Sequence, residues 1–143
     1  MKKFYFSLLL SIFSTAHADS LTGVREIDIV IEDLDADARN CGISNDLIDA
    51  SIRIPISNSK IKLVNSQSSP YLYANVNAFS QGAYCVLSMR LEFSKYAISE
   101  KQVGTFWRKG QVAVWERNNA GRRVANEFES YAKQFIAAWL KAN

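Results

Sequence analysis

The segment from Ala83 to Ile98 constrains the fold most strongly, because apolar side chains occupy every second position along most of its length. Successive residues of a β-strand point to opposite faces, so a period of two is typical of a strand with one buried face. The apolar set comprises Cys85, Leu87, Met89, Leu91 and Phe93. This pattern predicts a long strand in a sheet that covers a hydrophobic core.

Shorter segments with strand-like sequence complete a predicted sheet of about five strands. They are Val24–Leu34, Lys60–Ser66, Tyr71–Phe79 and Gln102–Glu116. Gly110 falls inside the last segment, where a glycine marks either a bulge in one long strand or a turn between two short ones. The sequence leaves that choice, and the register of the segment, open.

Two segments instead have helical spacing. Ser44 is a suitable N-cap for a helix that runs to about Arg53, since Pro55 disfavours helical geometry in the residue before it. A second, strongly amphipathic helix is predicted from about Arg122 to the C-terminus. Its apolar positions are Val124, Phe128, Tyr131, Phe135, Ile136 and Trp139. The polar stretches before the two helices, residues 35–42 and 118–121, are predicted to be turns.

The resulting element order is β-α-β-β-β-β-α. Runs of strands connected by short turns favour antiparallel pairing, and two amphipathic helices require a sheet face to pack on. The sequence therefore predicts an α+β fold, a two-layer sandwich with a mostly antiparallel sheet and two helices on one face.

Residues 1–18 have the pattern of a secretory signal peptide, with a positively charged start, an apolar run over Phe4–Phe13 and a small-residue site at Ala16–Ala18. The run is shorter than the roughly 20 residues of a membrane-spanning helix, so we expect no stable membrane insertion after cleavage. Cleavage would leave a single α+β domain, residues 19–143. The predicted location is the periplasm or the external medium.

Loss of this segment would remove His17, the one histidine, together with Lys2 and Lys3. A chain without histidine has no imidazole base or ligand, which excludes Ser-His-Asp and Cys-His catalysis. No pattern places a second carboxylate opposite Glu92 for acid–base chemistry. The acidic stretch 32–37 lacks the glycine and terminal Glu of a calcium loop, and is predicted to be a solvated turn. We expect no enzymatic activity, no cofactor and no metal.

Charge also limits the choice of partners. The formal net charge of +3 would fall to about +1 after cleavage, and the sequence has no basic stripe of the kind that binds nucleic acid. We therefore expect no nucleic-acid partner.

Cys41 and Cys85 are the two cysteines. In an oxidising compartment an even pair, without a CxxC motif or histidine, is typical of a structural disulfide. The bond would close a loop of about 45 residues and add about 3–4 kcal/mol in the chain-entropy model. A reactive thiol or a metal ligand is the alternative.

Four stretches give the chain a family resemblance, namely "GVREIDIVIEDL", "CGIS", "SPYLYANVNAF" and "TFWRKGQVAVW". With these, residues 19–143 resemble small secreted bacterial proteins of unknown function. The resemblance implies a compact secreted α+β protein and carries over no catalytic residue.

The face of the sheet opposite the helices gathers large side chains, which we predict to bind a partner. They are Tyr71, Tyr73, Tyr84, Arg90 and Tyr96. Either Phe106 or Trp107 would join them, depending on register. Tyr, Trp and Arg dominate the energetics of protein interfaces. The alternatives are ordinary cross-strand packing of the rings and burial by the loop 57–67.

We therefore expect a protein-binding module or accessory protein of the cell envelope, whose partner is another envelope or secreted protein. The alternative is a small-molecule or lipid-binding protein with a pocket between the sheet and the C-terminal helix. That pocket would be lined by Trp107, Phe128, Phe135 and Trp139. The partner's identity and the oligomeric state do not follow from the sequence.

Overall fold

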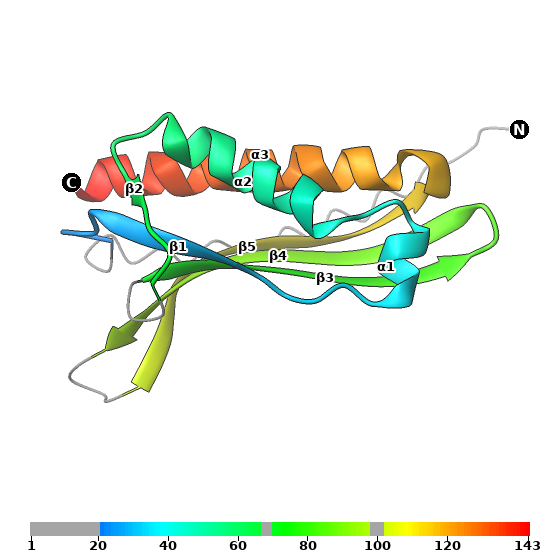
Figure 1. The fold of residues 1–143 in the computed structure, drawn as a ribbon, viewed down its shortest axis with the longest axis horizontal. Helices are drawn as coiled ribbons and strands as arrows, with labels where there is room; N and C mark the ends of the chain where they lie inside the picture. Colours follow the sequence, from blue (N-terminus) through cyan, green and yellow to red (C-terminus); the bar gives the residue numbers. More distant parts are fainter. Residues whose placement is uncertain (1–20, 67–69, 98–101) are drawn as a thin grey trace, which may run out of the picture.

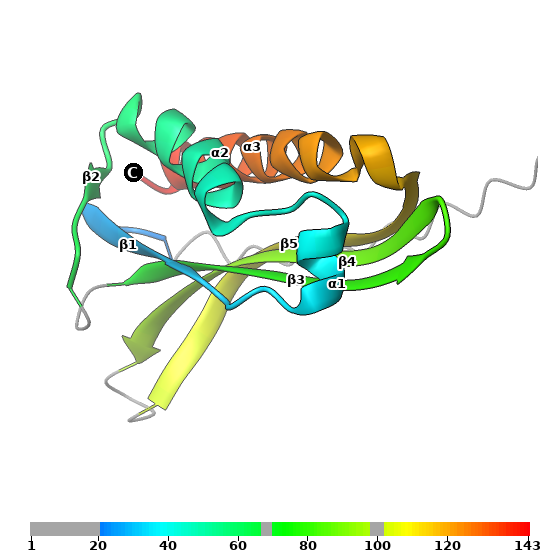
Figure 2. The same cartoon turned by 45° about the vertical axis from the view of Figure 1, so that its right-hand side comes forward.

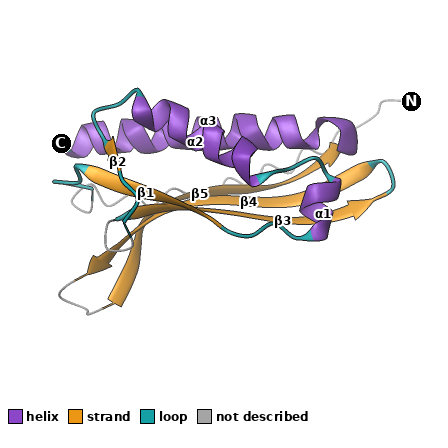
Figure 3. Ribbon diagram, in the orientation of Figure 1, coloured by secondary structure: helices purple, strands orange, loops and turns teal. Residues whose placement is uncertain are grey.

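The computed structural model describes residues 21–66, 70–97 and 102–143, and the predicted signal peptide lies outside them. The described chain forms a five-stranded sheet with two long helices on one face (Figure 1, Figure 3). The elements are β1 (Glu26–Ile31), α1 (Ala36–Asn40), α2 (Asn45–Ser57), β2 (Lys62–Leu63), β3 (Tyr71–Gln81), β4 (Tyr84–Ala97), β5 (Gln102–Glu116) and α3 (Arg117–Ala142). The predicted α+β fold is confirmed.

The sheet is mixed, and most of its paired residues are antiparallel, as predicted. Its strand order is β2-β1-β3-β4-β5. β1 runs parallel to both β2 and β3, whereas β3, β4 and β5 are antiparallel. The parallel pair β1–β2 arises because α1 and α2 return the chain to the end of the sheet where β1 began, as helical crossovers do.

Helices α2 and α3 lie side by side over the same face of the sheet (Figure 2). α2 buries Ile48, Ile52 and Ile56, which recur every four residues along one side of the helix. α3 buries the predicted positions Phe128 and Phe135 against the inward residues of β4. In the described part of the chain, no helix is both long enough and apolar enough to span a membrane.

α2 ends at Ser57 rather than at the predicted Arg53, and Pro55 lies inside the helix. A proline removes one backbone hydrogen bond and disfavours the helix locally. Here Ile52 and Ile56 are both fully buried on the same side of α2. Burial of a side chain of this size stabilises by about 1.5–3 kcal/mol, which offsets the cost of the proline.

α3 begins at Arg117 rather than at Arg122, so residues 118–121 lie within its first two turns and do not form a loop. The reason is a close contact between two glycines. A Cβ atom on Gly121 would lie 2.2 Å from the carbonyl oxygen of Gly42. Glycine at position 121 lets the start of α3 pass directly against the turn that follows α1.

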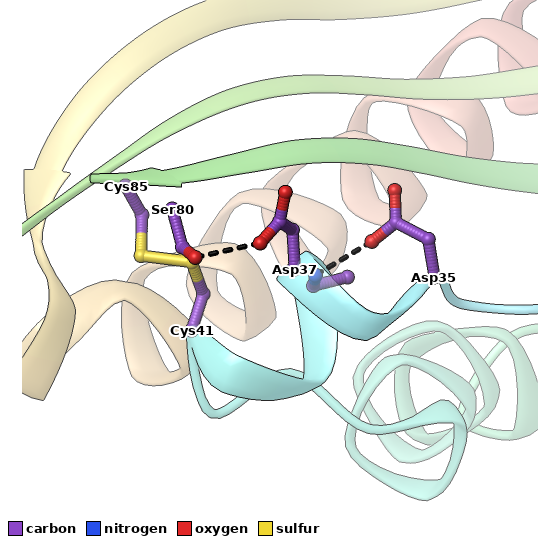
Figure 4. The surroundings of a disulfide bond; sticks show 6 residues. Asp35, Asp37, Cys41, Ser80 and Cys85 are labelled. Atoms are coloured by element: carbon purple, nitrogen blue, oxygen red, sulfur yellow. Dashed lines mark hydrogen bonds between the residues drawn. A yellow bond between two sulfur atoms is a disulfide. The ribbon is translucent and has the colours of Figure 1, made fainter.

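The acidic stretch predicted to be a solvated turn contains the short helix α1. Asp35 caps it by accepting a hydrogen bond from the backbone N–H of Ala38 (2.6 Å). Asp37 accepts one from the hydroxyl of Ser80 on β3 (2.6 Å; Figure 4). α1 therefore lies against the part of β3 that β1 does not reach.

The predicted disulfide between Cys41 and Cys85 is confirmed, with an S–S distance of 2.00 Å and a Cα–Cα distance of 6.2 Å. Both residues are fully buried. Figure 4 shows the bond joining the end of α1 to the start of β4. It ties the connection between β1 and α2 to the centre of the sheet.

β5 is one continuous strand, which resolves the choice that Gly110 left open. A Cβ atom on Gly110 would lie 2.6 Å from the carbonyl oxygen of Met89. The glycine therefore serves a close approach between β4 and β5 and does not mark a turn.

A β-bulge interrupts the register of β4 and β5. Phe93 pairs with Trp107 and Ser94 with Thr105, so Phe106 is the extra residue. Trp107 packs edge-on against Phe135 of α3 (5.4 Å between ring centroids), and Phe106 packs against the core. The expectation that one of these two rings joins the opposite face is therefore wrong, because a bulge places both on the helix side.

Candidate interaction surface on the uncovered sheet face

The face of the sheet opposite α2 and α3 is the candidate site, and we call it the outer face. Directly paired residues share a face of a sheet, so the strand register places each side chain. All five predicted partner-binding residues lie on the outer face: Tyr71, Tyr73, Tyr84, Arg90 and Tyr96. They do not form one cluster, and they belong to three regions with different chemistry.

The first region is apolar and lies near the β3–β4 turn. Phe79 pairs with Val86 on β4, which pairs in turn with Val114 on β5. Tyr84 and Val112 flank this row, and all five side chains are exposed, with Val112 at 70%. We call Phe79, Tyr84, Val86, Val112 and Val114 the apolar patch. Contiguous exposed apolar side chains are a common mark of an interaction surface.

Sequence reasoning placed only Tyr84 of this patch among the partner-binding residues. Val112 and Val114 were missed because the register of β5 was open, and a valine in a strand is equally typical of the core. In a single continuous strand, Val112 and Val114 lie on the same face as Gly110, because side chains alternate along a strand. Ala113 and Trp115 then point to the helix side. Treating Gln102–Glu116 as one strand would therefore have placed the two valines on the outer face.

The second region is a polar network across the middle of the outer face. Glu32, just after β1, accepts hydrogen bonds from the hydroxyl of Tyr73 and from the side-chain amide of Asn75. Asn77 donates to the side-chain oxygen of Asn75 (2.9 Å). Burial, followed by the hydrogen bond to Glu32, raises the pKa of Tyr73 above its ordinary value. Tyr73 thus belongs to a fixed polar array.

Next to this network, a carboxylate lies between two arginines. Glu92 is only 8% exposed. Its Oε1 lies 3.2 Å from Nε of Arg90 and 2.5 Å from Nε of Arg108. The arginine side chains remain about half exposed. The buried carboxylate therefore holds two solvent-accessible guanidinium groups in place on adjacent positions of the face.

The third region lies toward the opposite end of β4 and β5. Tyr71 is partly buried and pairs with Ser94, whereas Tyr96 pairs with Val103 and both are exposed. Figures 1 and 2 show this end of the two strands curving away from the helices. The bulge at Phe106 accounts for the bend, since bulges increase local twist.

A groove of about 480 Å³ follows β5, lined by residues 88–90 of β4 and 105–112 of β5. It contains Arg90 and Arg108 at one point and reaches Val112 of the apolar patch. The groove lies at the margin of the sheet, where β5 is the last strand.

The rings proposed for an interior pocket belong to the core. Phe128 and Phe135 are fully buried, and Phe135 lies 5.3 Å from Phe93. Trp139 donates from Nε1 to the carbonyl of Val24 (2.7 Å), which ties the end of α3 to the chain before β1. These contacts account for the aromatic residues of α3 by packing.

Among the described residues, no three His, Cys, Asp or Glu side chains lie close enough together to bind one metal ion. The acidic residues near α1 act instead as a helix cap and as hydrogen-bond acceptors.

No protein-family model matches the chain, and no curated protein matches it significantly. Among solved structures, a minor lipoprotein from Acinetobacter baumannii matches with a TM-score of 0.43 and 9% identity, over 84% of this chain and 94% of that one. The rare lipoprotein B from Shewanella oneidensis matches with a TM-score of 0.37 and 11% identity, over 82% and 92%. Similarity at this level carries no conclusion about function.

Proposed function

We propose that this protein is a non-enzymatic interaction module, periplasmic or secreted, that binds another envelope or secreted protein through the outer face of its sheet. The signal-peptide pattern of residues 1–18 supports the proposed compartment. The observation that supports the binding surface is the apolar patch, in which three side chains from three strands form a row and two more flank it.

The apolar patch is large enough to matter energetically. Full burial of a side chain of Val or Phe size stabilises by about 1.5–3 kcal/mol relative to leaving it exposed. The five side chains are 39–70% exposed, so burying the remainder would supply about half of five such values, which is comparable to the lower part of the roughly 4–15 kcal/mol that association costs in lost freedom. The neighbouring arginines, already held by Glu92, would orient the partner at little further cost in side-chain entropy.

The patch is also preorganised. Cys85 lies between Tyr84 and Val86 on β4 and carries the disulfide to Cys41. Phe79 is adjacent to Ser80, whose hydroxyl bonds to Asp37 of α1. Two of the three strands of the patch, β3 and β4, are therefore tied to the connection that follows β1, and rigid surfaces lose less entropy on binding.

The test is site-specific photocrosslinking in the native host. A photoreactive residue replaces Phe79, which is 57% exposed, and the matched control replaces Leu140 on α3, which is 59% exposed. We expect a discrete heavier band from position 79 alone, identified by mass spectrometry as an envelope or secreted protein. Equal labelling at both positions would point to non-specific contact.

A second variant links the band to the patch. Val86→Glu, introduced together with the crosslinker at position 79, is expected to abolish the band because it buries an unpaired charge in the interface. Val103→Glu, at an exposed position of the same face beyond the bulge, is the control and keeps the band. A band that survives Val86→Glu in a protein with a normal thermal transition contradicts the proposal.

A further inference from the structure

The two edges of the sheet differ. On one side β1 is flanked by β2, and α1 lies against the part of β3 that β1 leaves uncovered. On the other side β5 is the last strand, and no further strand of the described residues pairs with it. Edge strands expose backbone donors and acceptors, and they pair readily with another strand when they are long and regular.

The half of β5 after the bulge, Trp107–Glu116, pairs with β4 without interruption. Its outer-face residues are Arg108, Gly110, Val112, Val114 and Glu116. This series is nearly symmetric about Val112, with a cation at one end, an anion at the other and small or apolar residues between them. A strand with this pattern is complementary to a second copy of itself in the antiparallel direction.

We propose that two copies of this chain pair through β5, antiparallel and centred on Val112, to form one continuous sheet. In this register Arg108 of each copy lies opposite Glu116 of the other, Val114 lies opposite Gly110, and the two Val112 side chains meet. Oppositely charged cross-strand pairs stabilise a sheet and like charges destabilise it. The inference rests on the edge of β5 and does not depend on the proposed function.

Charge selects this register over its neighbours. The outer face of Trp107–Glu116 carries one charge of each sign. Any other antiparallel register that keeps both outer faces on one side places Arg108 or Glu116 opposite an uncharged residue or beyond the paired segment. The ion pair to Glu92 is compatible with the pairing, because a planar guanidinium has five N–H donors and can contact two carboxylates at once.

Pairing would also enlarge the interaction surface. Val112 and Val114 belong to both the apolar patch and the paired edge. The two patches of the dimer would therefore be adjacent across the two-fold axis and face the same side.

The first experiment uses engineered cysteines in the full-length mature protein. Directly opposed residues of an antiparallel pair have Cα atoms about 4.5–5.5 Å apart, within the range of a disulfide. Val112→Cys is therefore expected to form a covalent dimer under mild oxidation. Val114→Cys is the matched control, because the two copies of position 114 would be offset by about 13 Å along the strands. We expect dimer formation at least about tenfold faster for Val112→Cys.

The second experiment is sedimentation equilibrium of the unmodified protein, with Glu116→Arg as the variant and Glu129→Arg on α3 as its control. We expect a concentration-dependent monomer–dimer equilibrium, weakened about tenfold by Glu116→Arg, since it places like charges opposite each other twice. Glu129→Arg is expected to leave the equilibrium unchanged.

Three results would overturn the proposal. One is a protein that stays monomeric up to about 1 mM, a concentration at which even a Kd of about 1 mM would place half of the chains in dimers. Another is equal cross-linking rates for Val112→Cys and Val114→Cys. The third is capture of a different protein by a photocrosslinker at position 112, together with a purified chain that stays monomeric. That result would mean that β5 pairs with a strand of another protein. None of the three results would contradict the proposed function, because that function is tested by crosslinking at Phe79 and by the Val86→Glu variant.

Discussion

At the scale of single residues, Tyr131 is a buried side chain whose polar group is not compensated by a hydrogen bond among the described residues. It is 3% exposed, and its ring packs edge-on against Phe128 at 5.9 Å. Its hydroxyl has no hydrogen-bond partner within the described ranges of the chain. Burial, together with the charge of Glu127, raises the pKa of Tyr131 above its ordinary range. A buried hydroxyl without a partner costs stability that the ring's packing has to offset.

We predict that Tyr131→Phe leaves the free energy of unfolding at pH 7 unchanged or raises it by about 1 kcal/mol, because it removes an unsatisfied polar group and keeps the ring. Urea denaturation followed by circular dichroism measures the change. A loss of more than about 1 kcal/mol would show that the hydroxyl has a stabilising partner.

The same variant has a defined pH dependence. The unfolded tyrosine ionises near pH 10, whereas the folded one retains its proton to higher pH. The contribution to stability is therefore fully present below pH 10 and is lost as the pH rises above it. Between about pH 9 and about pH 11, Tyr131→Phe is expected to lose less stability than the parent protein, which urea denaturation at each pH measures.

At the scale of elements, the packing of α3 depends on Gly121, although glycine is a poor helix-forming residue. Gly121 lies in the second turn of α3 and is buried against the carbonyl of Gly42. The contact brings the start of α3 against the turn that carries Cys41. The position of the helix over β4 and β5 is thus set by close backbone packing as well as by its apolar side.

We predict that Gly121→Ala lowers the free energy of unfolding by about 1–3 kcal/mol through overpacking, although glycine-to-alanine in a helix ordinarily gains about 1 kcal/mol. Chemical denaturation gives the sign directly. The control is Ala137→Gly, at an exposed position of α3, which changes helix propensity without changing packing. It should lower the free energy of unfolding by about 1 kcal/mol. Stabilisation by Gly121→Ala would mean that the contact with Gly42 relaxes easily.

At the scale of the whole molecule, the disulfide joins the connection after β1 to β4, which lies between β3 and β5. The disulfide spans a sequence separation of 44 residues, and the hydrogen bond from Ser80 to Asp37 lies beside it. Together they hold the end of the sheet that carries the apolar patch.

We predict that replacing both Cys41 and Cys85 by alanine lowers the free energy of unfolding by about 3–4 kcal/mol, mainly because the unfolded chain regains the freedom of a long loop. Thermal and urea denaturation of the oxidised protein and the double variant measure the loss. Ser80→Ala is the local control and should cost only about 1 kcal/mol, since it removes one hydrogen bond. Equal losses would contradict the entropic account.

Much of the fold was predictable from local pattern. The alternation in β4 and the spacing of Phe128 and Phe135 identified a strand and a helix correctly, because each reflects which side of one element is buried. The cap at Ser44 and the Cys41–Cys85 bond were predictable for similar reasons. Alternation also placed Tyr73 and Arg90 on the outer face. Their role in binding stays a prediction.

The rest depended on contacts between segments far apart in the chain. Pro55 lies within α2 because Ile56 is buried in the core, and α3 begins early because Gly121 meets Gly42. The bulge at Phe106 sets which residues of β5 face outward. The sequence by itself determined the strands and the two long helices, their buried sides and the cysteine pair, but not the short helix α1. Tertiary structure decided their ends, the parallel pairing of β1 and the composition of the apolar patch, because long-range packing energies exceed the local preferences that a sequence displays.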